Sequence, residues 1–164
     1  MSRYPLTSAQ TILVGGLVMG SLDILKNIVF LSWQGRPWTY VLHIVASGAL
    51  GREAAFKGGF PVAMLGLFFH FVIAFTVFTL YYLASQRLET LARHPFVWGP
   101  LYGVAVFAAM RWVVFPMTAI GSVKTPPAVL LDGILTHILC VGLPTSLIVY
   151  EIGRGSSIPH GGVQ

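Results

Sequence analysis

Charged residues are scarce in this chain: Asp, Glu, Lys and Arg make up 9% of its 164 residues, and only five residues are acidic. With 55% hydrophobic residues and a mean hydropathy of +0.79, the composition lies far outside that of water-soluble domains. It predicts an integral membrane protein. The single cysteine, Cys140, excludes an intramolecular disulfide.

The sequence motifs of soluble enzymes are also missing. There is no phosphate-binding glycine loop, no metal-binding His-Glu motif and no serine nucleophile elbow, so catalysis is the least favoured class, although a membrane enzyme stays open. The net charge of +5 comes from scattered basic residues, which suit contact with lipid headgroups better than nucleic acid. We therefore expect the lipid bilayer as a partner, no nucleic acid and no cofactor.

Four apolar stretches have the length of roughly 20 residues that a helix needs to cross a membrane. They cover residues 12–31, 62–83, 97–118 and 128–149, and Pro126 and Pro127 suit the start of the last one. We predict an all-α integral membrane protein, an antiparallel four-helix transmembrane bundle that forms a single domain over residues 1–152. The Gly- and Ser-rich residues 153–164 are predicted to be a disordered tail.

The connection between the first two spans is long and partly apolar. Residues 38–50 are too short to cross the membrane and are followed by Arg52, Glu53 and Lys57, so residues 38–57 predict an interfacial or re-entrant helical segment. His43 in this connection, and His94 in the next, are expected at the surface or the interface.

Basic residues on the two sides of the membrane are equal in number. The short second connection, with Arg87 and Arg93, favours both termini in the cytoplasm.

Each span carries an ionisable residue near its middle: Asp23, His70, Arg111 and His137. A rise of about 1.5 Å per residue puts all four within about one helical turn of the same depth. Because ionisable groups are costly in hydrocarbon, this polar layer predicts either a functional site or structural ion pairs. We expect Asp23 to pair with Arg111 or Lys26, and Asp132 to take the other cation. The supporting polar residues are Lys26, Asn27, Asp132 and Cys140.

Small residues mark the faces on which helices are expected to pack. In the second span the side with Gly66 and His70 is expected to face inward, and the opposite side, with Phe68, Phe71, Phe75 and Phe78, is expected to face lipid. Pro116 and Pro144 are expected to free the backbone carbonyls of Trp112 and Cys140. The predicted packing glycines are Gly16, Gly20, Gly66, Gly99, Gly103 and Gly133.

Several stretches resemble a widespread, functionally uncharacterised family of small bacterial membrane proteins with four spans. They are Ala46–Gly51, Ala55–Gly59, Leu67–Phe71, Tyr81–Ser85, Arg93–Pro95 and Leu101–Val106. The resemblance implies a four-helix architecture in the bacterial inner membrane and no particular activity. In that family an Asn often stands at the position of Arg111.

Three functions remain open from the sequence. The polar layer binds or transfers protons, ions or a small solute, since imidazole groups change charge near neutral pH. Alternatively, the protein is a structural or accessory subunit of a larger membrane complex, or a homo-oligomer. The third alternative is haem or a transition metal bound through His70 and His137, with Asp23 and Cys140 as further metal ligands.

Overall fold

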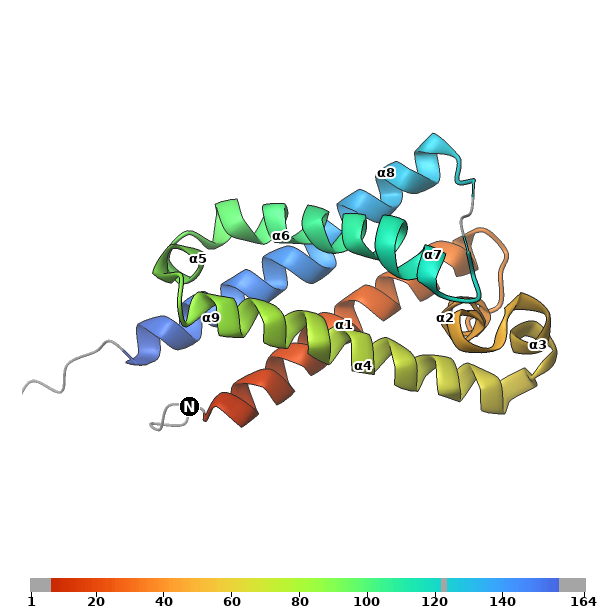
Figure 1. Ribbon diagram of the computed structural model, residues 1–164, viewed down its shortest axis with the longest axis horizontal. Helices are drawn as coiled ribbons and strands as arrows, with labels where there is room; N and C mark the ends of the chain where they lie inside the picture. Colours follow the sequence, from red (N-terminus) through yellow and green to blue (C-terminus); the bar gives the residue numbers. More distant parts are fainter. Residues whose placement is uncertain (1–6, 122–123, 157–164) are drawn as a thin grey trace, which may run out of the picture.

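Four long helical runs dominate the computed structural model, which describes residues 7–121 and 124–156 (Figure 1). All four are long and apolar enough to cross a membrane, and the described residues contain no strand, so the predicted all-helical protein with four candidate spans is confirmed. The first and second runs are α1 (Ser8–Trp33) and α4 (Gly59–Ser85). The third run joins α6 (Pro95–Ala109), a π-helical segment η1 (Met110–Val114) and α7 (Phe115–Met117). The fourth joins α8 (Pro127–Thr136), a second π-helical segment η2 (His137–Gly142) and α9 (Leu143–Ser156).

Three short helices lie at the two ends of the molecule. Helices α2 (Tyr40–Leu50) and α3 (Arg52–Lys57) lie at the end where α7 leads to α8 (Figure 1). Helix α5 (Glu89–Arg93) lies at the other end, together with the start of α1 and the end of α9. The break between α2 and α3 occurs at Gly51, whose φ of +77° is a conformation that side chains with a Cβ rarely adopt.

Local signals in the sequence explain where the long helices begin. Thr7 caps α1. Its hydroxyl accepts a hydrogen bond from the backbone N–H of Gln10 at 3.3 Å, and Oε1 of the Gln10 side chain accepts one from the backbone N–H of Thr7 at 2.9 Å. Pro95 and Pro127 stand in the first turns of α6 and α8, where the missing N–H group costs no helical hydrogen bond. The fourth run begins where Pro126 and Pro127 predicted a helix start, since Pro126 is the N-cap and Pro127 the first residue of α8.

The predicted lipid-facing side of α4 was wrong for three of its four phenylalanines. Phe68 is 61% exposed as expected, but Phe78 is fully buried. Phe71 and Phe75 also pack inward: a Cβ added at Gly20 would meet the ring of Phe71, and one added at Gly16 the ring of Phe75. The glycines of α1 leave room for the rings, so the phenylalanine side of α4 takes part in its interface with α1, which also includes Ala74 and His70 of the small-residue side.

Helix α2 is buried more deeply than the sequence suggested. Gly66 of α4 lies so close to α2 that a Cβ there would collide with the carbonyl of Leu42. His43, expected at the surface or interface, is buried, and its Nε2 lies 3.0 Å from the carbonyl oxygen of Gly59. Helices α2 and α4 can approach so closely only because Gly66 has no side chain.

The tail begins later than predicted, because α9 continues to Ser156. The remaining tail residues, 157–164, lie outside the described part of the chain.

Candidate functional site

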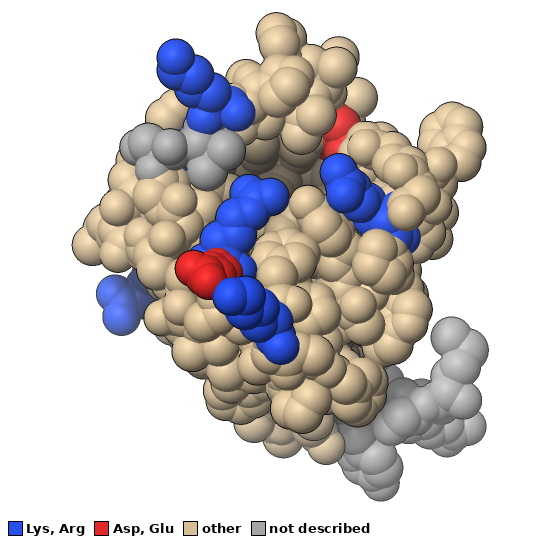
Figure 2. All heavy atoms as spheres, turned by 90° about the vertical axis from the view of Figure 1, so that its right-hand side faces the viewer, with Lys and Arg blue, Asp and Glu red and all other residues tan. Residues whose placement is uncertain are grey.

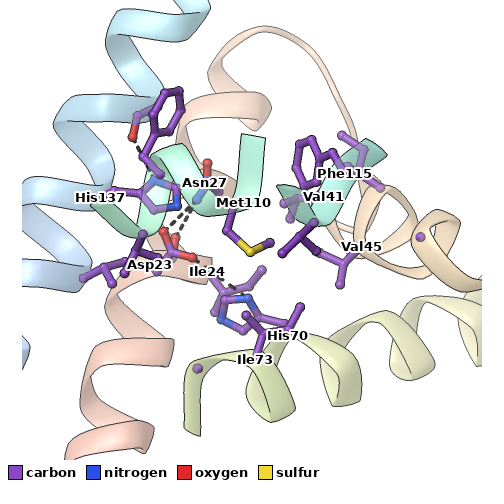
Figure 3. A pocket seen from close by; sticks show the side chains of 18 of the residues that line it. Asp23, Ile24, Asn27, Val41, Val45, His70, Ile73, Met110, Phe115 and His137 are labelled. Carbon is purple, nitrogen blue, oxygen red and sulfur yellow. Dashed lines mark hydrogen bonds and ion pairs between the residues drawn. The ribbon is translucent and has the colours of Figure 1, made fainter. Parts of the chain in front are cut away.

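A cavity of about 600 Å³ lies between the helical runs near the α2 end of the molecule. Its wall is mainly apolar and is formed by α1, α2, α4, the third run from α6 through α7, and the fourth run from α8 into η2. The structure places all four residues of the predicted polar layer, Asp23, His70, Arg111 and His137, on this one wall. Figure 3 shows Asp23 and Asn27 between the rings of His70 and His137.

The α1 side of the cavity carries Asp23 and Asn27, one helical turn apart. The Asn27 amide donates to the backbone oxygen of Asp23 at 2.9 Å and to its carboxylate Oδ1 at 3.2 Å. The side chain of Asp23 remains 17% exposed. The amide therefore orients the carboxylate without neutralising its charge.

His70 links α4 to α1 at the same level. Its Nε2 lies 2.8 Å from the carbonyl oxygen of Gly20, and because a carbonyl can only accept, this nitrogen carries the proton. The other ring nitrogen, Nδ1, then faces Oδ2 of Asp23 at 3.9 Å. In the neutral ring Nδ1 presents a lone pair to the carboxylate, and a proton on either group turns this contact into an attraction.

Two π-helical segments position Arg111 and His137, and the sequence analysis did not predict them. Arg111 lies in η1 and His137 begins η2, and each segment ends two residues before a proline, Pro116 or Pro144. A proline ring clashes with the carbonyl four residues earlier, and widening the preceding turns relieves the clash. The signal in the sequence was the proline in each span. Each proline was expected to free one backbone carbonyl, whereas the structure has a whole widened segment before it.

His137 is held by its own helix rather than by His70. Its Nδ1 lies 2.8 Å from the carbonyl oxygen of Gly133, and its ring stands edge-on to Phe107 with a centroid separation of 5.4 Å. These contacts leave the ring on the cavity wall beside Asp23 (Figure 3).

Glycines bring α6 directly against η2 behind His137. A Cβ at Gly103 would collide with the carbonyl of His137, and one at Gly99 with the hydroxyl of Ser146. Gly142 fits equally closely against Gly99 and Gly103. The backbones of α6 and η2 are therefore in contact, and α6 packs against the backbone carbonyl of His137.

The predicted pairing of Asp132 with one of the two cations is confirmed, whereas the predicted pairing of Asp23 with Lys26 or Arg111 was wrong. Lys26 pairs with Asp132, with its Nζ 2.6 Å from each carboxylate oxygen, and it lies 4.4 Å from the centre of the Phe30 ring. Arg111 donates to the Thr125 hydroxyl at 3.3 Å. Among the described residues Asp23 forms no ion pair with Lys26 or Arg111, and the nearest basic side-chain nitrogen recorded for it is Nδ1 of His70 at 3.9 Å.

The predicted supporting residues divide into two groups. Asn27 and Asp132 line the cavity, whereas Lys26 reaches it only through Asp132, and the half-buried Cys140 is not part of the wall. Within residues 7–121 and 124–156, no group of three or more His, Cys, Asp or Glu side chains is arranged to hold a metal ion. The site is thus an apolar cavity with one polar cluster.

Sequence reasoning missed the contribution of α2 to the site. Val41, Ile44, Val45 and Gly48 of α2 line the cavity, as does Met110 of η1. The only available signal was the apolar character of residues 38–50, which also suits an interfacial helix.

No protein-family model, curated protein or solved structure matches this chain. Any functional conclusion therefore depends on the geometry of the cavity.

Proposed function

We propose that this protein crosses the bacterial inner membrane as an antiparallel four-helix bundle and binds protons and a small, mainly apolar solute in its central cavity. In this proposal both termini are cytoplasmic, α2 re-enters the bundle and α3 lies at the opposite interface. The protein would serve as a carrier or receptor for the solute.

The observation that carries this proposal is the cavity itself. Packed protein interiors leave few gaps larger than a water molecule, so a partly open pocket of about 600 Å³ marks a place where the helices of the bundle do not close on one another. Its volume falls in the range of roughly 300–1,000 Å³ that is typical of sites for drug-sized molecules. A mainly apolar wall with few polar groups, among them Asp23, Asn27 and His70, suits an apolar solute with one polar group.

The contact between Asp23 and His70 supports the proton. Since Nε2 of His70 donates to Gly20, the neutral ring and the carboxylate would face each other with lone pairs at 3.9 Å. A proton on either partner removes this repulsion in an environment where water is scarce. A solute that donates a hydrogen or brings positive charge would do the same, so binding of the solute and of the proton should influence each other.

Solute binding can be tested with radiolabelled 1-naphthol, a neutral aromatic alcohol, in a scintillation proximity assay on the purified protein. We expect saturable binding to wild type, loss of binding in Ile73→Trp, which fills the cavity, and retained binding in Leu80→Trp. Leu80 is the matched control, because it lies on the same helix but is exposed outside the cavity. Absence of saturable binding to folded wild type would overturn the proposal and favour an accessory-subunit role.

The proton can be followed in liposomes loaded with a pH-sensitive dye under a potassium diffusion potential. We expect wild type to admit protons faster than His70→Ala, while the exposed His94→Ala behaves as wild type. Equal rates for wild type and His70→Ala would remove the proton from the proposal.

A further inference from the structure

We infer that the solute is a lipophilic cation, such as a quaternary or protonated amine with aromatic or aliphatic groups, which binds against the carboxylate of Asp23. The inference builds on the proposed function, since it names the chemical class that the same cavity would accept.

The carboxylate of Asp23 is incompletely matched within the protein. Its Oδ1 accepts from Asn27 at 3.2 Å, whereas Oδ2 accepts no hydrogen bond from any described residue and has only Nδ1 of His70 at 3.9 Å. A carboxylate offers about four acceptor positions, and an ionised carboxylate away from water requires a partner of opposite charge. In Figure 3 this group points into the cavity, where a bound cation would meet it.

The other charged groups near the cavity have partners elsewhere. Both oxygens of Asp132 are taken by Lys26, and the guanidinium of Arg111 donates to Thr125. The wall therefore offers a cation one carboxylate that lacks a Lys or Arg partner within the described residues. The titratable or charged groups that line the cavity together with Asp23 are His70, Arg111, Asp132 and His137, and Lys26 and Cys140 lie on the same helical runs outside its wall.

Aromatic rings form a second feature of the wall that favours a cation. The faces of aromatic rings attract positive charge, and the attraction is strongest where water is excluded. A quaternary ammonium or phosphonium ion can satisfy the carboxylate and the rings together, and its apolar substituents match the remaining wall. The rings on the wall belong to Phe69, Phe107 and Phe115, and to Phe30, which Lys26 already contacts.

An anionic amphiphile is the competing occupant, because the end of the molecule that carries α2 and α3 is basic. Several Lys and Arg side chains stand around a hollow at this end (Figure 2). The basic residues of the connections and of α3 at this end are Arg36, Arg52, Lys57 and Lys124, and none of them lines the cavity. They would attract an anion to the surface, whereas Asp23 would repel it from the interior.

Two ions of nearly the same shape and opposite charge test the inference: tetraphenylphosphonium and tetraphenylborate. We expect tetraphenylphosphonium to bind wild type at least about tenfold more tightly than tetraphenylborate, and Asp23→Asn to weaken its binding by at least about tenfold. Glu53→Gln, which alters an exposed carboxylate on α3, should bind both ions as wild type does.

The same preparations bind 1-naphthol if the cavity is intact, which separates the two proposals. Retained binding of 1-naphthol by Asp23→Asn shows that this variant is folded, so its loss of phosphonium binding reports the charge. Equal or tighter binding of tetraphenylborate, an unchanged phosphonium affinity in Asp23→Asn, or binding of neither ion while 1-naphthol still binds would each overturn the cation and leave the cavity's role standing. Failure of 1-naphthol to bind wild type would overturn the proposed function itself.

Discussion

The contact between α6 and η2 gives a prediction whose size follows from the structure. In Gly103→Ala the new methyl group would collide with the carbonyl oxygen of His137 and lie 2.7 Å from its carbonyl carbon and 2.8 Å from the Cα of Ile138. All three are backbone atoms, which cannot rotate away as a side chain could. The helices must therefore separate or bend.

Overpacking a well-packed interior costs about 1–3 kcal/mol, and a clash with backbone atoms belongs at the upper end of that range. Replacing Gly by Ala in a helix returns about 1 kcal/mol through helix propensity. The net loss for Gly103→Ala is then about 2 kcal/mol, which for a protein of this size lowers the melting temperature by roughly 4–8 °C.

Gly48→Ala is the matched control, since Gly48 is also helical. Its new methyl group would have no neighbour closer than 3.8 Å, an ordinary contact with Ile120 and Thr118. This variant should gain up to about 1 kcal/mol and melt at or slightly above the wild-type temperature. Melting in detergent, followed by circular dichroism, compares the three proteins. If Gly103→Ala melted as high as Gly48→Ala, the backbone contact between α6 and η2 would be refuted.

Two further predictions use the same melting assay. Phe78→Ala should lose about 2 kcal/mol of stability through the cavity it leaves, which is less than in a water-soluble core because lipid solvates apolar groups well. The exposed Phe68→Ala should lose less than about 1 kcal/mol. Equal losses would contradict the burial of Phe78 against α1. Lys26→Met should lose about 3 kcal/mol by leaving Asp132 without its partner, and the double variant Lys26→Met/Asp132→Leu should recover most of it. A double variant as unstable as the single one would show that the ion pair is not the cause.

Much of the fold could be predicted from composition and length. A helix rises a fixed distance per residue, so apolar stretches of sufficient length indicate the spans, and prolines mark helix starts at Pro95 and Pro127. The same rise predicted a common depth for Asp23, His70 and His137, and these three residues do line one cavity. Depth along a helix is a local property, and it can be counted without knowing the neighbouring helix.

Direction around a helix and the choice of partner depend on the neighbouring helix, and only the tertiary structure decided them. The rings of Phe71 and Phe75 turn inward because Gly20 and Gly16 of α1 leave space for them, which the sequence of α4 cannot show. Lys26 of α1 pairs with Asp132 of α8, 106 residues away in the sequence, and the widened turns of η2 lie against the glycines of α6 as well as before Pro144. The cavity onto which Asp23 opens is lined by α2 and by all four long runs, so no span determines it by itself.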